Sequence, residues 1–397
     1  ITLLGVGVLM NIVYKTSIDA IEQNYRASYQ STLKNSSRVM DMNLKNIVDV
    51  GRNFLNDEAL QQILEKGNEY GGSKFASTDR EKLRVIANEM AVALQKNGKN
   101  IYAVGNRTHE KAAAFAEKYG IGKVYDDFHE MFTDPEVGVI YITTPHNTHL
   151  GFMKEAIANG KHILVEKSIT LNSDELDEAI ALAKEKGVII GEAMTIYHMP
   201  IYKELKKILD SGRLGRVNLI TMNFGSFKEY NMKNRFFNRN LAGGAMLDIG
   251  VYALSFLRWF FDSKPDQLLS QVKPAPTGVD EQAGLLLTNQ EGQMASVMLS
   301  LHSKQPKRGM VSCENGFIEI MEYPRAWEAK ITDASTGESE IIKAGDNADA
   351  LAYELADMER AINGDASAMH LDYTKDVMDL MTSFRRTWGY TYPEEEK

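Results

Sequence analysis

Apolar and polar positions follow the clearest pattern between residues 137 and 169, where a strand, a helix and a second strand succeed one another. The apolar, β-branched run 137–142 has the length of a strand that is buried on both faces. Apolar side chains at helical spacing come next. A second strand, 163–165, then delivers Glu166 and Lys167 at its carboxyl end. This unit predicts a crossover of a parallel sheet, in which both strand ends border one crevice.

The same pattern divides the chain into an alternating α/β part and a later part that is rich in strands. Between about residues 86 and 200 the predicted strands are 101–104, 124–125 and 188–191, and the predicted helices are 108–119, 128–132 and 173–186. Beyond residue 214 the predicted strands are 216–226, 282–289, 293–301, 308–313, 316–322, 326–333 and 338–343, followed by helices 349–363 and 372–388. Asn315-Gly316 predicts a hairpin turn. The fold class is α/β, with a Rossmann-like parallel sheet and an α+β domain that holds a large antiparallel or mixed sheet.

The start of the chain does not supply the strand and glycine turn that usually begin such a sheet. Residues 1–14 are almost wholly apolar, and they allow two interpretations: the remainder of a membrane-spanning helix, or a first Rossmann strand ending at Gly5 to Gly7. The membrane remnant is favoured, because the third glycine position of the Rossmann turn falls on Met10. A capping-box pattern at Thr78 begins a helix that Asn97-Gly98 ends.

Composition narrows the possible functions. At 397 residues, with 44% hydrophobic and 25% charged residues, the chain is long enough for two or more domains. A net charge of -9 argues against a nucleic-acid partner, because phosphate binding needs a basic surface. The single cysteine excludes internal disulfides, and the histidines never adopt metalloprotease spacing, so no metal site is predicted.

Two stretches carry residues that suit proton and hydride chemistry. Lys167, at a strand end, could orient a carbonyl or assist proton transfer, although a solvated loop lysine is the ordinary alternative. In GGAMLDIGVY, residues 243–252, two glycines let the backbone approach a ligand closely. Asp248 and Tyr252 stand at i and i+4 on one helix face, where a cap and a core aromatic are the ordinary alternative.

The segment after strand 101–104 bears on the cofactor. In dinucleotide-binding sheets an acid at this position bonds the ribose 2′-hydroxyl of NAD. Here Asn106 and Arg107 stand instead, and an arginine suits the 2′-phosphate of NADP, although a surface arginine is the ordinary alternative. NADP is therefore favoured, with NAD possible.

Together these motifs resemble the family of glucose-fructose oxidoreductase, inositol dehydrogenase and MocA over about residues 86–397. GGAMLDIGVY and EAMTIYH, residues 192–198, are similar to motifs of its dihydrodiol and xylose dehydrogenase branch. The resemblance implies NAD(P)-dependent hydride transfer on a sugar or cyclic diol, with Lys167 catalytic, Tyr252 as acid/base and Asp248 orienting the tyrosine or the sugar. It also implies cofactor contacts from Asn106, Arg107, Thr144, Pro145, Asn147, His149 and Glu166, and substrate contacts from Arg235 and His198.

The chain departs from this family in two places. Ser168 follows Lys167 where the family has proline, so a trans peptide bond is expected there. The first strand and its GxGxxG turn are missing, which removes the usual cradle of the pyrophosphate. Residues 1–84 instead resemble the beginning of a YesM-type sensor histidine kinase, which predicts a chimera without any kinase core.

The predicted domains are a helical membrane-anchor or sensor-like remnant, a truncated NAD(P)-binding domain, a substrate and dimerisation domain, and C-terminal helices, at residues 1–84, 85–200, 201–348 and 349–397. The predicted function is that of a cytoplasmic oxidoreductase. A homodimer through its second sheet is the expected assembly. Membrane contact is expected only if residues 1–14 form an anchor. One alternative is a catalytically impaired chimera that lacks the pyrophosphate loop. Another is a membrane-tethered sensory protein.

Overall fold

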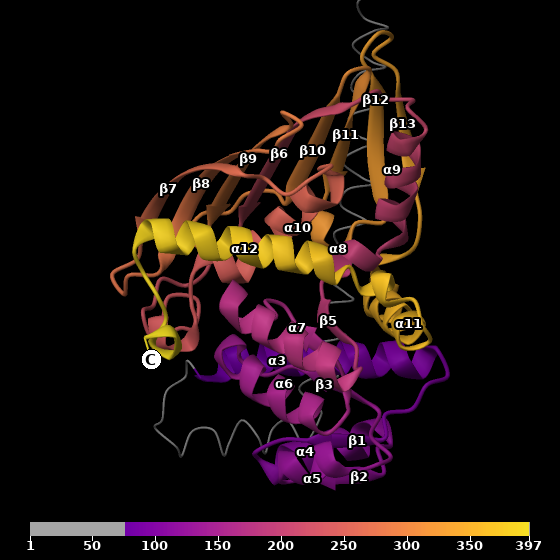
Figure 1. Ribbon diagram of the computed structural model, residues 1–397, viewed down its shortest axis with the longest axis vertical. Helices are drawn as coiled ribbons and strands as arrows, with labels where there is room; N and C mark the ends of the chain where they lie inside the picture. The colour runs from indigo at the N-terminus through magenta and orange to yellow at the C-terminus, as the bar shows by residue number, and fades with distance from the viewer. Residues whose placement is uncertain (1–75, 397) are drawn as a thin grey trace, which may run out of the picture. The chain divides into compact units, whose positions relative to one another are not determined.

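The computed structural model of the chain describes residues 76–396 (Figure 1). The interpretations of residues 1–14, and most of the sensor-like segment 1–84, lie outside these residues. Within them, one stretch, Arg239–Phe260, is long and apolar enough to cross a membrane. Its most apolar window is 83% buried inside the protein, which is the setting of a core helix and only weak evidence for a membrane span.

The first half of the described chain alternates strands and helices, as predicted. Its elements are α3 (Ala76–Lys96), β1 (Ala103–Gly105), α4 (His109–Tyr119), β2 (Lys123–Tyr125), α5 (Phe128–Thr133), β3 (Val139–Ile142), α6 (His149–Ala158), β4 (His162–Glu166), α7 (Ser173–Lys186) and β5 (Ile190–Ala193). The predicted crossover is confirmed, because β3 and β4 pair in parallel from Val139 opposite His162 to Ile142 opposite Val165. β4 also pairs in parallel with β5, so the carboxyl ends of these strands share one edge.

The parallel sheet is divided into two pieces. β1 and β2 form a two-stranded piece, and β3, β4 and β5 form a three-stranded piece. Among residues 76–396, no strand pairs with the remaining edge of β1 or of β3. The first strand of a Rossmann sheet stands between these two positions. Within residues 76–396 this place between β1 and β3 is not filled by a strand.

Polar side chains around Asp134 connect the two pieces. One carboxylate oxygen, Oδ2, accepts hydrogen bonds from Lys123 Nζ at 2.7 Å and from the Tyr102 hydroxyl at 3.0 Å. The backbone carbonyl of Asp134 accepts a hydrogen bond from Nζ of Lys161, the residue directly before β4, at 2.6 Å. Asp134 thus joins Tyr102 and Lys123, from the piece with β1 and β2, to Lys161, from the piece with β4. Within residues 76–396 these bonds connect the two pieces where no strand does.

Helices cover both faces of the three-stranded piece. Ile140, Ile163 and Val165 are buried in one cluster with apolar residues of α6 and α7. Leu164, on the opposite face of β4, packs in a second cluster with residues of α3 and α11 (Ala350–Ile362). Burial on both faces explains why these strands are continuous apolar runs rather than alternating ones.

The second half contains one mixed eight-stranded sheet (Figure 1). Its strands are β6 (Val217–Gly225), β7 (Gln267–Pro274), β8 (Asp280–Thr288), β9 (Met294–Ser300), β10 (Arg308–Cys313), β11 (Gly316–Met321), β12 (Glu328–Asp333) and β13 (Ser339–Lys343), in the spatial order β13-β12-β11-β10-β6-β9-β8-β7. Only β6 and β9 pair in parallel. The hairpin prediction is confirmed, but the turn is Glu314-Asn315, and Gly316 already belongs to β11.

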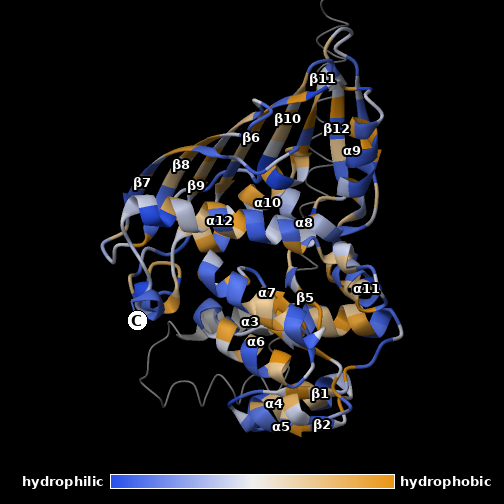
Figure 2. Ribbon diagram, in the orientation of Figure 1, coloured by the Kyte–Doolittle hydropathy of each residue, from blue (hydrophilic) through white to orange (hydrophobic). Residues whose placement is uncertain are grey.

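One strand of this sheet, β7, was not predicted. It lies at the sheet edge, pairs only with β8, and has no fully buried residue. Figure 2 shows apolar and polar residues alternating along strands of the sheet. The helices α10 (Val251–Phe260) and α12 (Leu371–Trp388) lie along one face of this sheet, and α12 also packs on α7. Ala283, Leu285 and Leu287 of β8 are buried under these helices, whereas Leu286 is half exposed.

Candidate active site

The loop that follows β4 places Lys167 against a turn of the second half of the chain. Its side chain is 12% exposed, and Nζ donates a hydrogen bond to the backbone carbonyl of Asp248 at 2.6 Å. The same nitrogen lies 3.5 Å from Asp248 Oδ1 and 4.6 Å from the centre of the Tyr252 ring. The structure thus brings together the three residues that were predicted to be catalytic.

The turn that receives the lysine is a short π-helix, Met246–Gly250, which continues directly into α10. Besides the bond to Lys167, it accepts one from Ser168 Oγ on the Leu247 carbonyl at 3.0 Å. π-Turns often occur at functional sites, because the changed helical pairing leaves groups for other partners. The peptide bond between Lys167 and Ser168 is cis. The expected trans bond was therefore wrong.

The two glycines before this turn serve contacts within the chain. A Cβ atom at Gly243 would lie 2.4 Å from the carbonyl oxygen of Arg235. A Cβ at Gly244, which has φ +124°, would lie 2.2 Å from Asp280 Oδ1. The sequence interpretation assigned this freedom to a ligand. In the structure it lets Arg235 and Asp280 approach the turn.

The surroundings of Tyr252 favour the neutral phenol. Burial raises the pKa of its hydroxyl well above the ordinary value, and the negative charge of Glu166 adds to this effect. The positive charge of Arg325 opposes it. At neutral pH Tyr252 therefore carries its proton and can donate it to an oxygen that gains negative charge.

Histidines from the segment after β3 hold the lysine loop from one side. His149 is completely buried, and its ring nitrogens contact the carbonyl oxygens of Thr144 at 2.8 Å and Ser168 at 3.1 Å. It therefore cross-links two loops, and its predicted contact with the cofactor stays a prediction. His146 contacts the Lys167 carbonyl through Nε2 at 3.0 Å. Sequence reasoning missed His146, whose only signal was a second histidine in the same short loop.

A buried carboxylate holds the loop from the other side. Glu192, in β5, is 1% exposed and accepts hydrogen bonds from the Ile169 backbone N–H at 3.0 Å and from the Thr374 hydroxyl at 3.2 Å. Burial raises the pKa of Glu192 to about 7. Sequence reasoning recorded this residue only as the start of the EAMTIYH motif. The lysine loop is thus held on one side by the histidines that follow β3 and on the other side by Glu192 of β5.

The other predicted cofactor residues after β3 and β4 have partners within the chain. Glu166 is 8% exposed and accepts a hydrogen bond from the Tyr141 hydroxyl. Thr148 Oγ1 donates to the Pro145 carbonyl at 2.7 Å, and the same oxygen lies 2.8 Å from the Thr144 hydroxyl, which can donate to it. Asn147 donates to Glu394 of the C-terminal segment at 2.7 Å.

The two predicted substrate residues lie in different places. Arg235 Nη2 is 3.2 Å from Asp248 Oδ1, and its guanidinium stacks 4.4 Å from the centre of the Phe236 ring, so it belongs to the lysine cluster. His198, in α8 (Thr195–His198), is 1% exposed. It contacts Asp357 of α11 at 2.9 Å. The structure does not bring His198 to the cluster, because the packing of α8 against α11 buries it.

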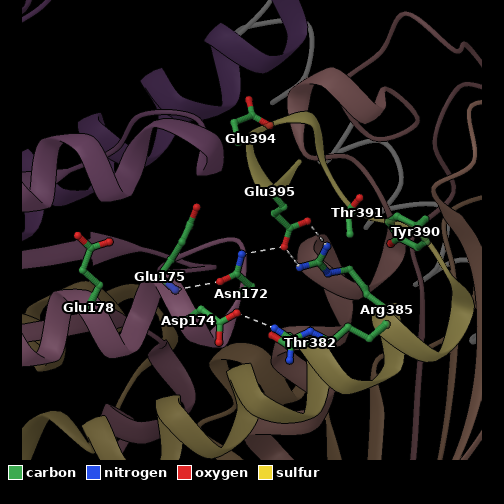
Figure 3. Close-up of a pocket in the computed structure, with 11 residues that line it drawn as sticks. Asn172, Asp174, Glu175, Glu178, Thr382, Arg385, Tyr390, Thr391, Glu394 and Glu395 are labelled. Carbon is green, nitrogen blue, oxygen red and sulfur yellow. Dashed lines mark hydrogen bonds and ion pairs between the residues drawn. The ribbon is translucent and has the colours of Figure 1, made fainter. Parts of the chain in front are cut away.

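A cavity of about 340 Å³ lies away from these residues, between α7, α12 and the C-terminal segment (Figure 3). Its lining includes five carboxylates, of Asp174, Glu175, Glu178, Glu394 and Glu395, but neither Lys167 nor Tyr252. Arg385 is 1% exposed and binds both carboxylate oxygens of Glu395 at 2.8 Å. The surplus of negative charge does not suit an anionic dinucleotide.

Comparison with known proteins identifies the family. Residues 45–194 match the oxidoreductase family with an NAD-binding Rossmann fold, and residues 202–319 match the GFO/IDH/MocA C-terminal domain. Trans-1,2-dihydrobenzene-1,2-diol dehydrogenase of Xenopus tropicalis is 30% identical over 239 residues, which cover 59% of this chain and 72% of the frog protein. This chain belongs to the GFO/IDH/MocA oxidoreductase family.

Other relatives and solved structures agree with this membership. The Mus musculus enzyme of the same name is 26% identical over 324 residues, covering 79% of this chain and 97% of the mouse protein. A 3-ketoreductase from Actinomadura kijaniata in complex with NADP has a TM-score of 0.67 at 19% identity, over 75% of this chain and 92% of that one. Aldose-aldose oxidoreductase from Caulobacter crescentus has a TM-score of 0.66 at 22% identity, over 73% and 90%. These structures share the fold of the described residues.

The family binds a nicotinamide dinucleotide, which needs protein groups at both of its ends and at its pyrophosphate. Lys167 follows β4, at the strand-end edge where ligands of parallel sheets bind, and Tyr252 lies beside it. At the end of β1, Arg107 is exposed, and Asn106 accepts a hydrogen bond from the Thr108 N–H at 2.9 Å. α3 is the first described element, so the segment that would carry a strand and a glycine turn before it lies outside residues 76–396. The described residues therefore offer groups for the two ends of NADP, and a pyrophosphate-binding turn is not among them.

Proposed function

We propose that this chain transfers a hydride between NADP(H) and the hydroxyl or carbonyl carbon of a sugar or cyclic diol. The observation that carries the proposal is the contact of Lys167 with Asp248 and Tyr252, at the carboxyl end of a parallel strand, in a member of an NAD(P)-dependent family. Ligands of such sheets bind beyond the strand ends. The substrates in the names of the relatives, a dihydrodiol and aldoses, agree with this class.

Each side chain of the cluster has a task in this reaction. Lys167 holds and polarises the reacting oxygen, and the backbone carbonyl of Asp248 sets the position of the ammonium group by accepting its hydrogen bond. The protonated Tyr252 gives its proton to that oxygen when a carbonyl is reduced, and it regains one when a hydroxyl is oxidised. The cofactor, when bound, supplies or accepts the hydride at C4 of its nicotinamide. Arg235, bonded to Asp248, lines the substrate side.

The preference for NADP rests on the end of β1. No acid stands where NAD would need one, and Arg107 can form a planar, charge-assisted pair with the adenosine 2′-phosphate. A cytoplasmic location, where this cofactor is abundant, fits the proposal. A membrane contact would depend on residues 1–14.

The second candidate function is a catalytically impaired chimera. The observation that favours it is the unpaired edge of β1 and of β3 within residues 76–396, where the pyrophosphate-binding turn belongs. Against it, the family match begins at residue 45, so the segment directly before α3 carries family-like sequence.

We also propose a homodimer through the uncovered face of the large sheet. Leu269, Leu286 and Met298 are between 50% and 69% exposed on adjacent strands β7, β8 and β9. Apolar surface of this kind is typical of an interaction site. Light scattering should give twice the chain mass, and Met298→Glu should halve it. A monomeric wild-type chain would contradict the dimer.

The proposed activity is tested by following NADPH consumption with a panel of aldoses, ketoses and cyclic diols. Wild-type turnover that Lys167→Ala abolishes would support the proposal. Lys154→Ala is the matched control, because Lys154 is a half-exposed lysine of α6 whose pairing with Glu178 lies at the surface. Absence of saturable NADPH binding by the wild-type chain would instead favour the impaired chimera, because such a chimera lacks the pyrophosphate-binding turn.

A further inference from the structure

Asp280, the first residue of β8, is completely buried and makes two directed contacts. One carboxylate oxygen, Oδ2, accepts a hydrogen bond from the backbone N–H of Met246 at 2.6 Å. The other, Oδ1, accepts one from the Tyr390 hydroxyl. Hydrogen bonds to an ionised acceptor are about twice as strong as neutral ones. Asp280 thus fixes a specific point of the backbone.

That point is the beginning of the π-helix that receives the lysine loop. Met246 is its first residue, and the next two carbonyl groups accept the hydrogen bonds of Ser168 and Lys167. Gly244 leaves room for this contact, because a Cβ atom there would lie 2.2 Å from Asp280 Oδ1. The position of the Asp248 carbonyl relative to Lys167 is therefore set from its amino-terminal side by Asp280.

The C-terminal segment after α12 braces Asp280 in turn. Tyr390 supplies the second hydrogen bond, and Tyr392 donates to the Gly243 carbonyl at 2.7 Å. The two tyrosine rings meet edge to face, with centres 5.9 Å apart, and the Arg385 guanidinium lies 4.5 Å from the centre of the Tyr392 ring. Residues far apart in sequence thus converge on the two glycines.

We infer that Asp280, braced by Tyr390, is a positioning residue that holds the Asp248 turn against Lys167. The inference rests on the proposed function only for the role of Lys167, since the contacts themselves need no cofactor. Removing the carboxylate leaves the buried N–H of Met246 without this acceptor, which is unfavourable and lets the turn shift. Lys167 then loses the acceptor that restrains its ammonium group.

The test measures the chemical reactivity of Lys167 in the full chain without cofactor. Trinitrobenzenesulfonate labels amines, and mass spectrometry of the peptides gives the labelling rate of Lys167 relative to Lys161. Lys161 is the internal reference, because it is also buried and donates at 2.6 Å to the Asp134 carbonyl, outside the turn. We expect Asp280→Ala to raise the ratio of Lys167 to Lys161 labelling about fivefold or more.

Two further variants separate positioning from loosened packing. Asp280→Asn keeps an oxygen that accepts from Met246, so its ratio should stay within about twofold of wild type. Tyr390→Phe removes only one hydroxyl, which should raise the ratio about twofold and gives the answer if Asp280→Ala does not fold.

An unchanged ratio in folded Asp280→Ala and in Tyr390→Phe would overturn the inference. An equal rise in the labelling of both lysines would do so too, because it would mean general loosening. The assay contains no NADP, so a failure of the proposed oxidoreductase activity would not alter its result.

Discussion

The two ends of the expected cofactor site differ in how completely the described residues build them. At the catalytic end, Lys167 is held from the β3 side by His146, from the β5 side through Glu192, and from the π-helix Met246–Gly250 through Asp248. At the phosphate end, β1 pairs only with β2, and no described strand joins it to β3. Asp134 and its partners carry the connection instead.

This difference indicates that, in this fold, the residues proposed for catalysis and the segment that binds the pyrophosphate belong to separate elements. The catalytic cluster depends on the ends of β3, β4 and β5 and on the π-helix, all of which are formed within residues 76–396. The pyrophosphate grip depends on a central strand and the amino terminus of its helix. A change in the pyrophosphate-binding turn therefore need not disturb the cluster around Lys167, and substitutions at one end of the site should leave the other end unchanged.

The largest effect is expected at the catalytic end. Lys167→Ala removes the group that we propose holds the reacting oxygen, and we expect turnover to fall about 1,000-fold, within the range that acid/base and positioning groups supply. The fluorescence titration with NADPH should change little, because the phosphate end is untouched. A variant that loses cofactor binding and turnover together would show that the two ends are not separate.

Amide hydrogen exchange compares the two pieces of the sheet directly. β4 is paired on both sides and its residues 163–165 are at most 1% exposed, whereas β1 is partly exposed and, within residues 76–396, paired on one side. We expect the amides of β4 to exchange about 100-fold more slowly than those of β1, since local opening is easier where few contacts must break. Equal protection would contradict the division of the sheet.

Glu192, which holds the lysine loop from β5, should make the free energy of unfolding depend on pH. Glu192 has a folded-state pKa of about 7 against an ordinary value of 4.5, so the folded chain binds the extra proton between these pH values. Its contribution to the free energy of unfolding therefore falls as pH rises from 4.5 to 7, by about 3 kcal/mol. Glu192→Gln should remove this slope in urea unfolding at pH 5 and pH 8. An identical pH dependence in both proteins would refute the assignment.

The smallest effect concerns cofactor choice at the phosphate end. Arg107→Ala should lower the preference for NADPH over NADH about tenfold, as expected for the loss of one exposed charge-assisted contact to a phosphate. Competition titrations with the two reduced cofactors measure this ratio. Lys111→Ala, a change in the exposed face of the following helix α4, is the control and should leave the ratio unchanged.

Local patterns were enough for much of the fold and for the centre of the site. The crossover from β3 to β4 is an apolar run, a helix stripe and a second apolar run, so its parallel pairing followed from sequence. The spacing of Asp248 and Tyr252 likewise predicted one common face, and in the structure both lie beside Lys167. β7 was missed because an edge strand that buries no residue completely has little apolar signal.

Contacts between distant segments were beyond sequence reasoning. Asp280 meets Met246 across 34 residues and Tyr390 across 110, and nothing near Asp280 in sequence marks it. His198 was expected at the substrate because its motif is similar to the family's. The packing of α8 on α11 places it beside Asp357 instead.

The proposed NADP(H)-dependent activity is tested most directly by titrating the full chain with NADPH and following the fluorescence of the reduced nicotinamide. Saturable binding, weakened by Arg107→Ala and retained by Lys167→Ala, is the predicted result. Absence of saturable binding by the wild-type chain would contradict the proposed activity. Recovery of binding after exchange of residues 1–75 for a strand and GxGxxG turn would then assign the defect to the phosphate end alone.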